Sequence, residues 1–219
     1  MKGIAYFLKS SIYVSLTNRC NAVSLIESRG PSFCMPASSG FAPLPPNAEP
    51  TAQQVADAVA AAFGDERFDG GAPPNEVCFA GAGEPLLRRR CLEEAAVLIG
   101  QQHSGVKLRL NTNGLVPASE AADVAASLRA AGISAASVAL ATADAAQYEQ
   151  LMRPDSIRLT PAFSLPLGLD EVTGFVAACV AEGMAVECNA VEAPGVDLAA
   201  AGALAETLGA SFRTRPYHA

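Results

Sequence analysis

Residues 76–87 have the sequence EVCFAGAGEPLL, which predicts a strand, a glycine-rich turn and the beginning of a helix. The strand is expected from Glu76 to Ala80 because these residues are mostly apolar and precede a cluster of turn-forming residues. The turn takes up residues 81–85, and a helix is expected from about Leu86 to Ile99. Strand, turn and helix in this order make one β/α unit.

The same unit recurs along the chain. A strand expected over residues 107–110 precedes the turn Asn111 to Gly114 and a helix expected over residues 119–131. Further strands are expected at 12–16, 137–140, 157–159, 185–191 and 211–215, and further helices at 51–63, 145–152, from 170 onward and 197–208. Because a crossover helix returns each strand in the same direction, alternating units predict a mainly parallel sheet. Six units are too few for a closed eight-stranded barrel, which leaves two α/β folds: a partial (β/α)6 barrel or a doubly wound sheet.

The length and composition fit one domain that spans residues 1–219, with a long loop rich in Pro, Ser and Gly at about 28–50. The net charge of -7 disfavours a nucleic-acid partner. The apolar stretches are too short and too interrupted to cross a bilayer, and the amino terminus lacks the pattern of a secretory signal. We therefore expect a cytoplasmic protein without a membrane partner, whose six cysteines are reduced thiols.

Three short segments come directly after predicted strands. Cys20 ends the segment that follows the first of these strands, and the turns at 81–85 and 111–114 follow two later ones. In a parallel α/β sheet, ligands bind at the carboxyl ends of the strands. The sequence therefore predicts a ligand site where these three segments meet.

Taken in order, the segments TNRC (17–20), GAGEP (81–85) and NTNG (111–114) resemble three motifs of the radical S-adenosylmethionine (SAM) superfamily. The resemblance extends to the group associated with TatD-type nucleases through YEQLMRP (148–154) and FRTRPYH (212–218), so that it spans nearly the whole chain. It implies a partial (β/α)6 barrel of the radical SAM type.

The resemblance also implies two cofactors, SAM and a [4Fe-4S] cluster that reductively cleaves SAM to a 5'-deoxyadenosyl radical. Cys20 is the implied metal ligand. The implied cofactor-binding residues are those of the two turns: Gly81, Gly83, Glu84, Pro85, Asn113 and Gly114. Of these, the first three are expected at the methionine end of SAM and the last two at a neighbouring wall.

The ligand spacing departs from the superfamily. Its CxxxCxxC pattern, counted from Cys20, places Ser24 and Glu27 where two further cysteines are expected, so one thiolate of three remains. Iron-sulfur clusters depend on soft thiolates, which a hydroxyl and a carboxylate do not replace. Cys34 lies in the same long loop and is a candidate for a replacement ligand, together with Glu27; the alternative is an ordinary loop thiol.

Three functions follow as hypotheses. The first is a radical SAM enzyme acting on an unidentified substrate, and the second is a cluster-free, non-catalytic relative that binds a small molecule or an unidentified protein partner. The third is a strand-end pocket that binds an anionic metabolite through Arg213 and Arg215, which point to one face of the last predicted strand.

Overall fold

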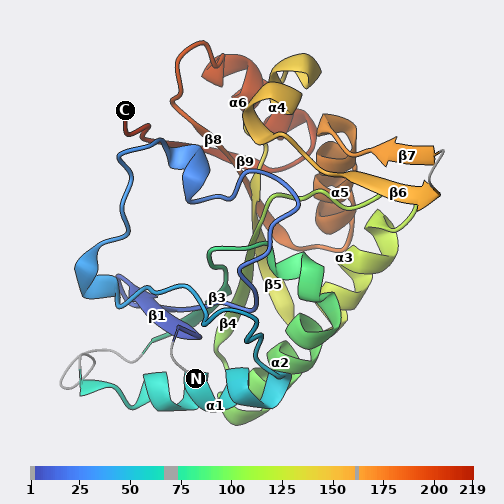
Figure 1. Ribbon diagram of the computed structural model, residues 1–219. Coiled ribbons are helices and arrows are strands. Elements are labelled where there is room, and N and C mark those ends of the chain that lie inside the picture. Colours follow the sequence, from blue (N-terminus) through green and yellow to red (C-terminus); the bar gives the residue numbers. More distant parts are fainter. Residues whose placement is uncertain (1–2, 67–73, 161–162) are drawn as a thin grey trace.

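A computed structural model describes residues 3–66, 74–160 and 163–219. Its main sheet has seven strands in the order β1-β2-β3-β4-β5-β8-β9, with β1 antiparallel to β2 and the other five neighbouring pairs parallel. The strands are β1 (Ala5–Leu8), β2 (Ser11–Val14), β3 (Glu76–Phe79), β4 (Lys107–Thr112), β5 (Ile133–Ala139), β8 (Ala185–Val191) and β9 (Ser211–Arg215). The prediction of a mainly parallel sheet is confirmed, and six of its seven strands run parallel (Figure 1).

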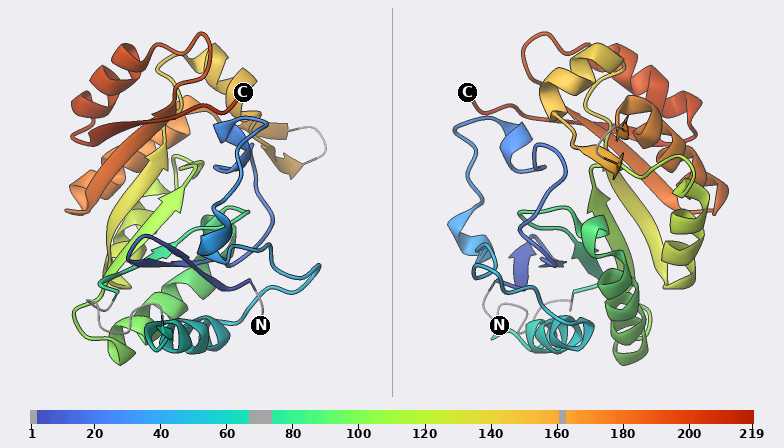
Figure 2. Two further views of the ribbon diagram at one scale, coloured as in Figure 1. Left: turned by 90° about the vertical axis from the view of Figure 1, so that its left-hand side faces the viewer. Right: turned by 45° about the vertical axis from the view of Figure 1, so that its right-hand side comes forward.

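The helices cover one face of this sheet (Figure 2). They are α1 (Ala52–Phe63), α2 (Arg89–Gln102), α3 (Ala121–Ala130), α4 (Ala145–Met152), α5 (Leu169–Ala181) and α6 (Leu198–Thr207). A doubly wound sheet has helices on both faces and a strand order that reverses, whereas here the order follows the chain. The fold is therefore an open partial barrel, whose inner face lies opposite the helices.

Side chains alternate between the two faces of the sheet. Leu108 and Leu110 of β4 belong to the core beneath the helices, while Asn111 lies on the inner face. Local signals also fix where the helices begin: Thr51 caps α1 in a capping box with Gln54, and the side chain of Asp197 caps α6. Hydrophobic packing thus sets which face of the sheet the helices cover, and capping residues set where α1 and α6 begin.

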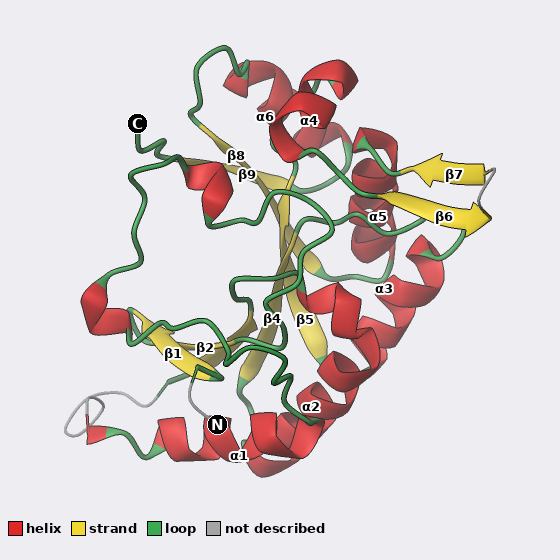
Figure 3. Cartoon of the chain, in the orientation of Figure 1, coloured by secondary structure: helices red, strands yellow, loops and turns green. Residues whose placement is uncertain are grey.

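One predicted strand is not part of the sheet. The segment expected at 157–159 forms β6 (Ser156–Thr160), which pairs antiparallel with β7 (Phe163–Pro166) in a separate hairpin (Figure 3). The position beside β5 that this strand would need is taken by β8, since β5 already pairs with β4 and β8. A period-2 pattern predicts a strand but does not identify its neighbour, which explains the error.

The predicted long loop is confirmed as mostly irregular, apart from two short 3-10 turns at Glu27–Arg29 and Ala37–Ser39. We call residues 21–50 the covering loop because they cross the inner face of the sheet, opposite the helices (Figure 2). None of the helices in the described ranges has the length and apolar character needed to cross a membrane.

Candidate functional site

The three segments that follow β2, β3 and β4 meet at the carboxyl edge of the sheet, as expected. The backbone N–H of Glu84 donates to the carbonyl oxygen of Arg19 (2.8 Å), which joins the second segment to the first. The Asn113 side chain donates to Oδ1 of Asn21 (2.8 Å) and lies 3.8 Å from the sulfur of Cys20, which joins the third segment to the first. The order of strands in the sheet therefore brings the motifs together.

Glu84 is the centre of these contacts. Its side chain is 2 % exposed and accepts hydrogen bonds from the Thr112 hydroxyl (2.8 Å) and from the backbone N–H groups of Leu86 (3.0 Å) and Asn113 (2.8 Å). Burial raises the pKa of this carboxyl to about 7, although the three donors oppose the shift. All of these partners belong to the chain, so the carboxyl ties the turn after β3 to the end of β4.

Glycine is required at position 83 because two backbones approach each other there. A Cβ atom on Gly83 would lie 2.7 Å from both the carbonyl carbon of Asn18 and the carbonyl oxygen of Thr17, and closer still to the carbonyl oxygen of Arg19. Backbone atoms cannot move aside as a flexible side chain can. The glycine therefore allows the turn after β3 to pack directly on the segment before Cys20.

Gly114 has a different role from the one expected. Its φ of +74° favours glycine, and a Cβ there would lie 2.7 Å from Cγ1 of Val138 and 3.3 Å from Cγ1 of Val172. Both neighbours belong to the core between the sheet and α5. Gly114 thus faces the core rather than the inner cavity. Pro85 likewise is buried at the first position of a 3-10 turn that precedes α2.

Cys20 has surroundings that favour the neutral thiol. Burial raises its pKa and the nearby Glu84 raises it further, whereas hydrogen bonds from the backbone of Ala22 and from Asn113 lower it. The hydroxyl of Tyr148, a fully buried residue of α4, has no hydrogen-bond partner in the described part of the chain. Burial raises the pKa of Tyr148, and Glu84 and Cys20 add to the shift.

Ser24 and Glu27, at the two remaining positions of the cluster motif, bond to each other's backbone. The N–H of Ser24 donates to Oε2 of Glu27 (3.1 Å), and the N–H of Glu27 donates to Oγ of Ser24 (3.2 Å). This reciprocal pattern matches the capping box S-x-x-E. It lies just before the turn Glu27–Arg29, whose own N-cap, Ile26, makes no side-chain hydrogen bond. Both side chains therefore stabilise the local backbone of the covering loop.

Replacing Ser24 by alanine is expected to lower the free energy of unfolding by about 1 kcal/mol, because the N–H of Glu27 loses its acceptor. Urea denaturation followed by circular dichroism measures the change. Ser28→Ala is the matched control: its hydroxyl donates to the carbonyl oxygen of Leu25 and has no part in the capping box. Equal stability of Ser24→Ala and the wild type would contradict the structural role of Ser24.

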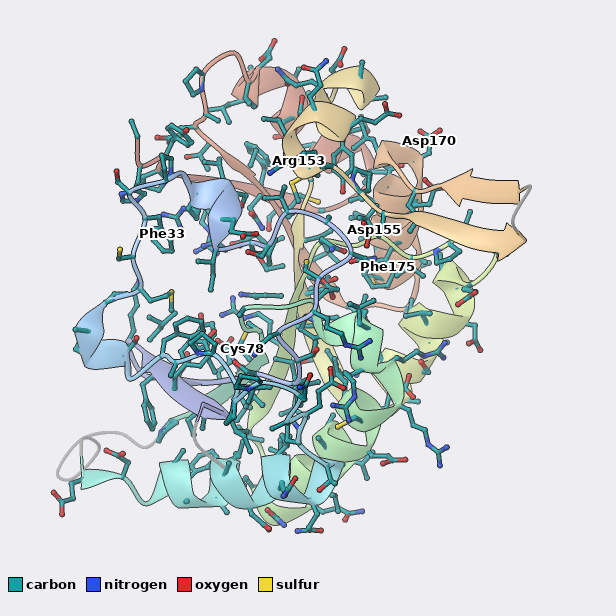
Figure 4. All side chains as sticks on the ribbon, viewed as in Figure 1. Phe33, Cys78, Arg153, Asp155, Asp170 and Phe175 are labelled. Carbon is teal, nitrogen blue, oxygen red and sulfur yellow. The ribbon has the colours of Figure 1, made fainter. Side chains whose placement is uncertain are left out.

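The other two segments of the resemblance also contact the covering loop. The backbone after α4 binds its beginning, since Val23 N–H donates to Met152 O (2.7 Å) and Asp155 N–H donates to Asn21 O (2.8 Å). Arg153, between these two contacts, has a φ of +44° and ends α4 (Figure 4).

The carboxyl-terminal segment binds the same loop further along. The N–H of His218 donates to Arg29 O (2.8 Å), the N–H of Ser32 donates to His218 O (3.2 Å), and the rings of Phe33 and His218 lie 5.2 Å apart. The covering loop is thus attached near residue 22 and near residue 30, and its far end is attached as well, where the Asn18 side chain binds the backbone of Leu44 and Glu49 pairs with Arg19.

Beneath this loop lies a cavity of about 140 Å³ on the inner face of the sheet, which we call the inner cavity. Residues of the sheet strands, of the turn after β3 and of the covering loop form its walls. The lining residues are Tyr6, Leu8, Tyr13, Leu25, Ile26, Ser28, Arg29, Phe33, Met35, Ala80, Gly81, Gly83, Asn111, Ser137, Asn189, Val191 and Arg215. Of the residues singled out from the sequence, Gly81, Gly83 and Arg215 line it.

The remaining cysteines do not join Cys20. Four of them, Cys78, Cys91, Cys179 and Cys188, are buried, as predicted, and Cys34 is exposed on the covering loop. Among the described residues, no three His, Cys, Asp or Glu side chains come together in an arrangement that could hold a metal ion.

Several residues of the site were missed by the sequence reasoning. The turn expected to begin at Asn111 begins later, because β4 extends to Thr112. Thr112 supports Glu84, and Asn111 faces the cavity. The alternation of polar and apolar residues runs from Lys107 to Asn111, and Thr112 is a β-branched residue of the kind common in strands; both were usable signals for the longer strand. Arg29 and Asn21 carry no local signal, because tertiary contacts alone bring them to the site.

No known family model and no curated protein matches the sequence. Solved structures do match in fold. SuiB of Streptococcus suis, in a complex with the precursor peptide SuiA, aligns with a TM-score of 0.63 at 14% identity over 96% of this chain. SuiB bound to SAM gives 0.62. TsrM of Kitasatospora setae, a radical SAM methyltransferase with bound cobalamin and a [4Fe-4S] cluster, gives 0.51 at 14% identity over 92% of this chain.

The fold is that of radical SAM enzymes. At this level of identity the likeness concerns the fold alone, and it confirms the expected open barrel with a mainly parallel sheet. The chain spans 40% of the length of SuiB and 36% of that of TsrM.

Proposed function

We propose that this chain is a radical-SAM-fold protein that binds a small molecule of the SAM class in the inner cavity without a [4Fe-4S] cluster. The observation that carries this proposal is the capping box between Ser24 and Glu27. At the two positions where the motif needs thiolates, the side chains are engaged with the backbone instead.

The residues present do not fit the cluster. A serine hydroxyl stays protonated at neutral pH and a carboxylate is a hard ligand, whereas cluster irons need soft thiolates. Burial raises the pKa of Cys20, which disfavours even the remaining thiolate. Cys34 is an exposed thiol of the covering loop, and in the described part of the chain it belongs to no group of side chains that could hold a metal ion. We therefore assign the site no step that depends on a cluster.

Binding of a SAM-class ligand is supported by the half of the cavity next to β3. Gly81 and Gly83 expose backbone there, and the buried Oδ1 of Asn111 has no hydrogen-bond partner in the described part of the chain. An unpaired acceptor of this kind is costly unless a ligand or water donates to it. SuiB, which has this fold, has been solved with bound SAM.

Iron analysis after anaerobic reconstitution with iron and sulfide tests the absence of a cluster. The wild type is expected to bind no stoichiometric iron and to remain colourless, because it offers one thiolate of three. The double variant Ser24→Cys with Glu27→Cys restores the CxxxCxxC spacing from Cys20 and is expected to bind about four irons per chain with a brown absorbance. About four irons in the wild type would overturn the proposal and favour the radical SAM enzyme.

Isothermal titration calorimetry tests the ligand. We expect SAM and 5'-methylthioadenosine to bind the wild type as purified. Asn111→Leu is the test variant, because it removes the unpaired side-chain acceptor from the wall of the cavity. Binding that is absent from the wild type, or unchanged in a folded Asn111→Leu variant, would contradict a SAM-class ligand in this cavity.

The finer assignments extend the same proposal. We propose, on its sequence motifs, that the chain belongs to the TatD nuclease-associated group. We also propose that it works in the cytoplasm and binds no nucleic acid. The three consecutive arginines at the start of α2 support the absence of a nucleic-acid partner, because Arg88, Arg89 and Arg90 each form an ion pair with a glutamate of this chain. They therefore do not form a free basic patch for phosphates.

A further inference from the structure

Two arginines are the only charged side chains among the described residues that line the inner cavity. Arg215 reaches it from the end of β9, and Arg29 reaches it from the covering loop. The chain as a whole carries a net charge of -7, so a cavity wall with two cations and no carboxylate is contrary to its average composition.

The nearby carboxylates are already paired with other groups. Glu187 of β8 binds Arg213 (2.6 Å) and accepts from the Ser137 hydroxyl (3.1 Å), and Glu76 of β3 binds Arg109 (2.8 Å). In the described ranges, neither Arg29 nor Arg215 forms an ion pair with a carboxylate. The charge of Glu187 does act on Arg215 and raises its pKa, but this carboxylate is already paired with Arg213. Among the described residues, neither cavity arginine therefore has an ion-pair partner of its own.

Arg29 is held in position by other contacts. Its Nε donates to the carbonyl oxygen of Pro216 (3.0 Å), and its guanidinium carbon lies 4.6 Å from the centre of the Phe33 ring. Within the described ranges, its terminal nitrogens donate to no protein group and can therefore donate to a ligand. Packing, rather than an acidic partner, holds this charge at the cavity.

The two arginines and Arg213 also repel one another. The pKa of Arg215 is lowered by burial and then by the charge of Arg213, and the pKa of Arg29 is lowered by the same two causes in the same order. Like charges that are brought together and partly desolvated are unfavourable for the free protein, and an anion between them removes that cost.

We propose that Arg29 and Arg215 form a site in the inner cavity for the oxyanion group, a phosphate or a carboxylate, of a small-molecule ligand. The inference rests on the proposed function, since it names the chemistry that the same cavity recognises. Guanidinium groups suit it because their planar N–H donors match the oxygens of carboxylate and phosphate. The half of the cavity next to Asn111 holds the rest of the ligand.

Thermal unfolding in the presence of inorganic phosphate, acetate or chloride at equal ionic strength tests the site. We expect phosphate or acetate to raise the Tm of the wild type above its value in chloride, because a ligand of the folded state stabilises it. The anion that gives the larger effect identifies the group. If neither anion exceeds chloride, the proposal is overturned.

Arg215→Gln is the test variant and Arg90→Gln its matched control. The Arg90 side chain is 93% exposed and pairs with Glu94 on the surface of α2. We expect Arg215→Gln to weaken anion binding at least tenfold. We also expect it to raise the Tm in chloride, because the repulsion between the arginines is relieved. If Arg215 had only a structural role, its replacement would lower the Tm instead. Arg90→Gln should bind anions as the wild type does. Undiminished anion binding by Arg215→Gln would overturn the proposal.

The two proposals fail in different ways. 5'-Methylthioadenosine has no carboxylate or phosphate, so it should bind Arg215→Gln as it binds the wild type. If the wild type binds phosphate or acetate through Arg215 but does not bind this nucleoside, the anion site stands and the SAM-class ligand is wrong. If the nucleoside binds while neither anion does, the anion site alone is wrong.

Discussion

Replacing Gly83 by alanine is expected to lower the free energy of unfolding by about 3 kcal/mol. This is the upper end of the usual cost of inserting an extra carbon atom into a well-packed interior. The new methyl group would meet backbone atoms of Thr17, Asn18 and Arg19, none of which belongs to a flexible side chain. The turn after β3 and the segment before Cys20 would have to separate, and the hydrogen bond from Glu84 N–H to Arg19 O would be lost. Urea denaturation at neutral pH measures the effect.

Gly100→Ala is the matched control for this substitution. Gly100 lies inside α2, and a Cβ there meets nothing within 4 Å. Alanine costs less backbone entropy than glycine in a helix, so we expect this variant to gain about 0.5–1 kcal/mol. If Gly83→Ala proves as stable as the wild type, the close packing of the two backbones is wrong.

The stability of the protein is expected to fall as the pH rises through 7, because of Glu84. Its pKa in the folded state, about 7, lies above the ordinary value of 4.5, so the folded state binds this proton more tightly than the unfolded chain. The stabilisation is fully present below pH 4.5 and is lost as the pH rises through 7. For a shift of this size the loss is about 3 kcal/mol in the free energy of unfolding.

Glu84→Gln separates this effect from other titrations, because glutamine carries no titrating proton. We expect its free energy of unfolding, measured by urea denaturation between pH 5 and 8, to depend less on pH than that of the wild type. Glu94→Gln, on the surface of α2, should keep the wild-type dependence. If Glu84→Gln does not fold, Thr112→Val removes one donor to the carboxylate and should move the decrease to higher pH. Parallel curves for the wild type and a folded Glu84→Gln would show that Glu84 does not titrate in this range.

Much of the fold could be predicted from the sequence because its signals are local. The strand that begins at Glu76, the helix at 145–152 and the caps at Thr51 and Asp197 all depend on neighbouring residues, and the structure contains them. The pairing of β6 could not be predicted in this way. Its partner is set by which sheet edges are already occupied, which is a property of the whole fold.

For the site, the sequence predicts which segments meet but not which way their side chains point. That Cys20, the turn after β3 and the end of β4 come together follows from parallel strand order, and the contacts of Glu84 and Asn113 bear this out. The direction in which each side chain points does not follow from strand order. Gly114 therefore faces the core against the expectation, while Arg29 reaches the cavity only because the covering loop is bound to residues near the other end of the chain.

The attachment of the covering loop has a practical consequence. Backbone hydrogen bonds join Asn21, Val23 and Arg29 to distant parts of the chain and fix the path of the loop. These bonds lie at separate points of the loop. Losing one of them should therefore free the backbone near that residue, while the other points stay attached.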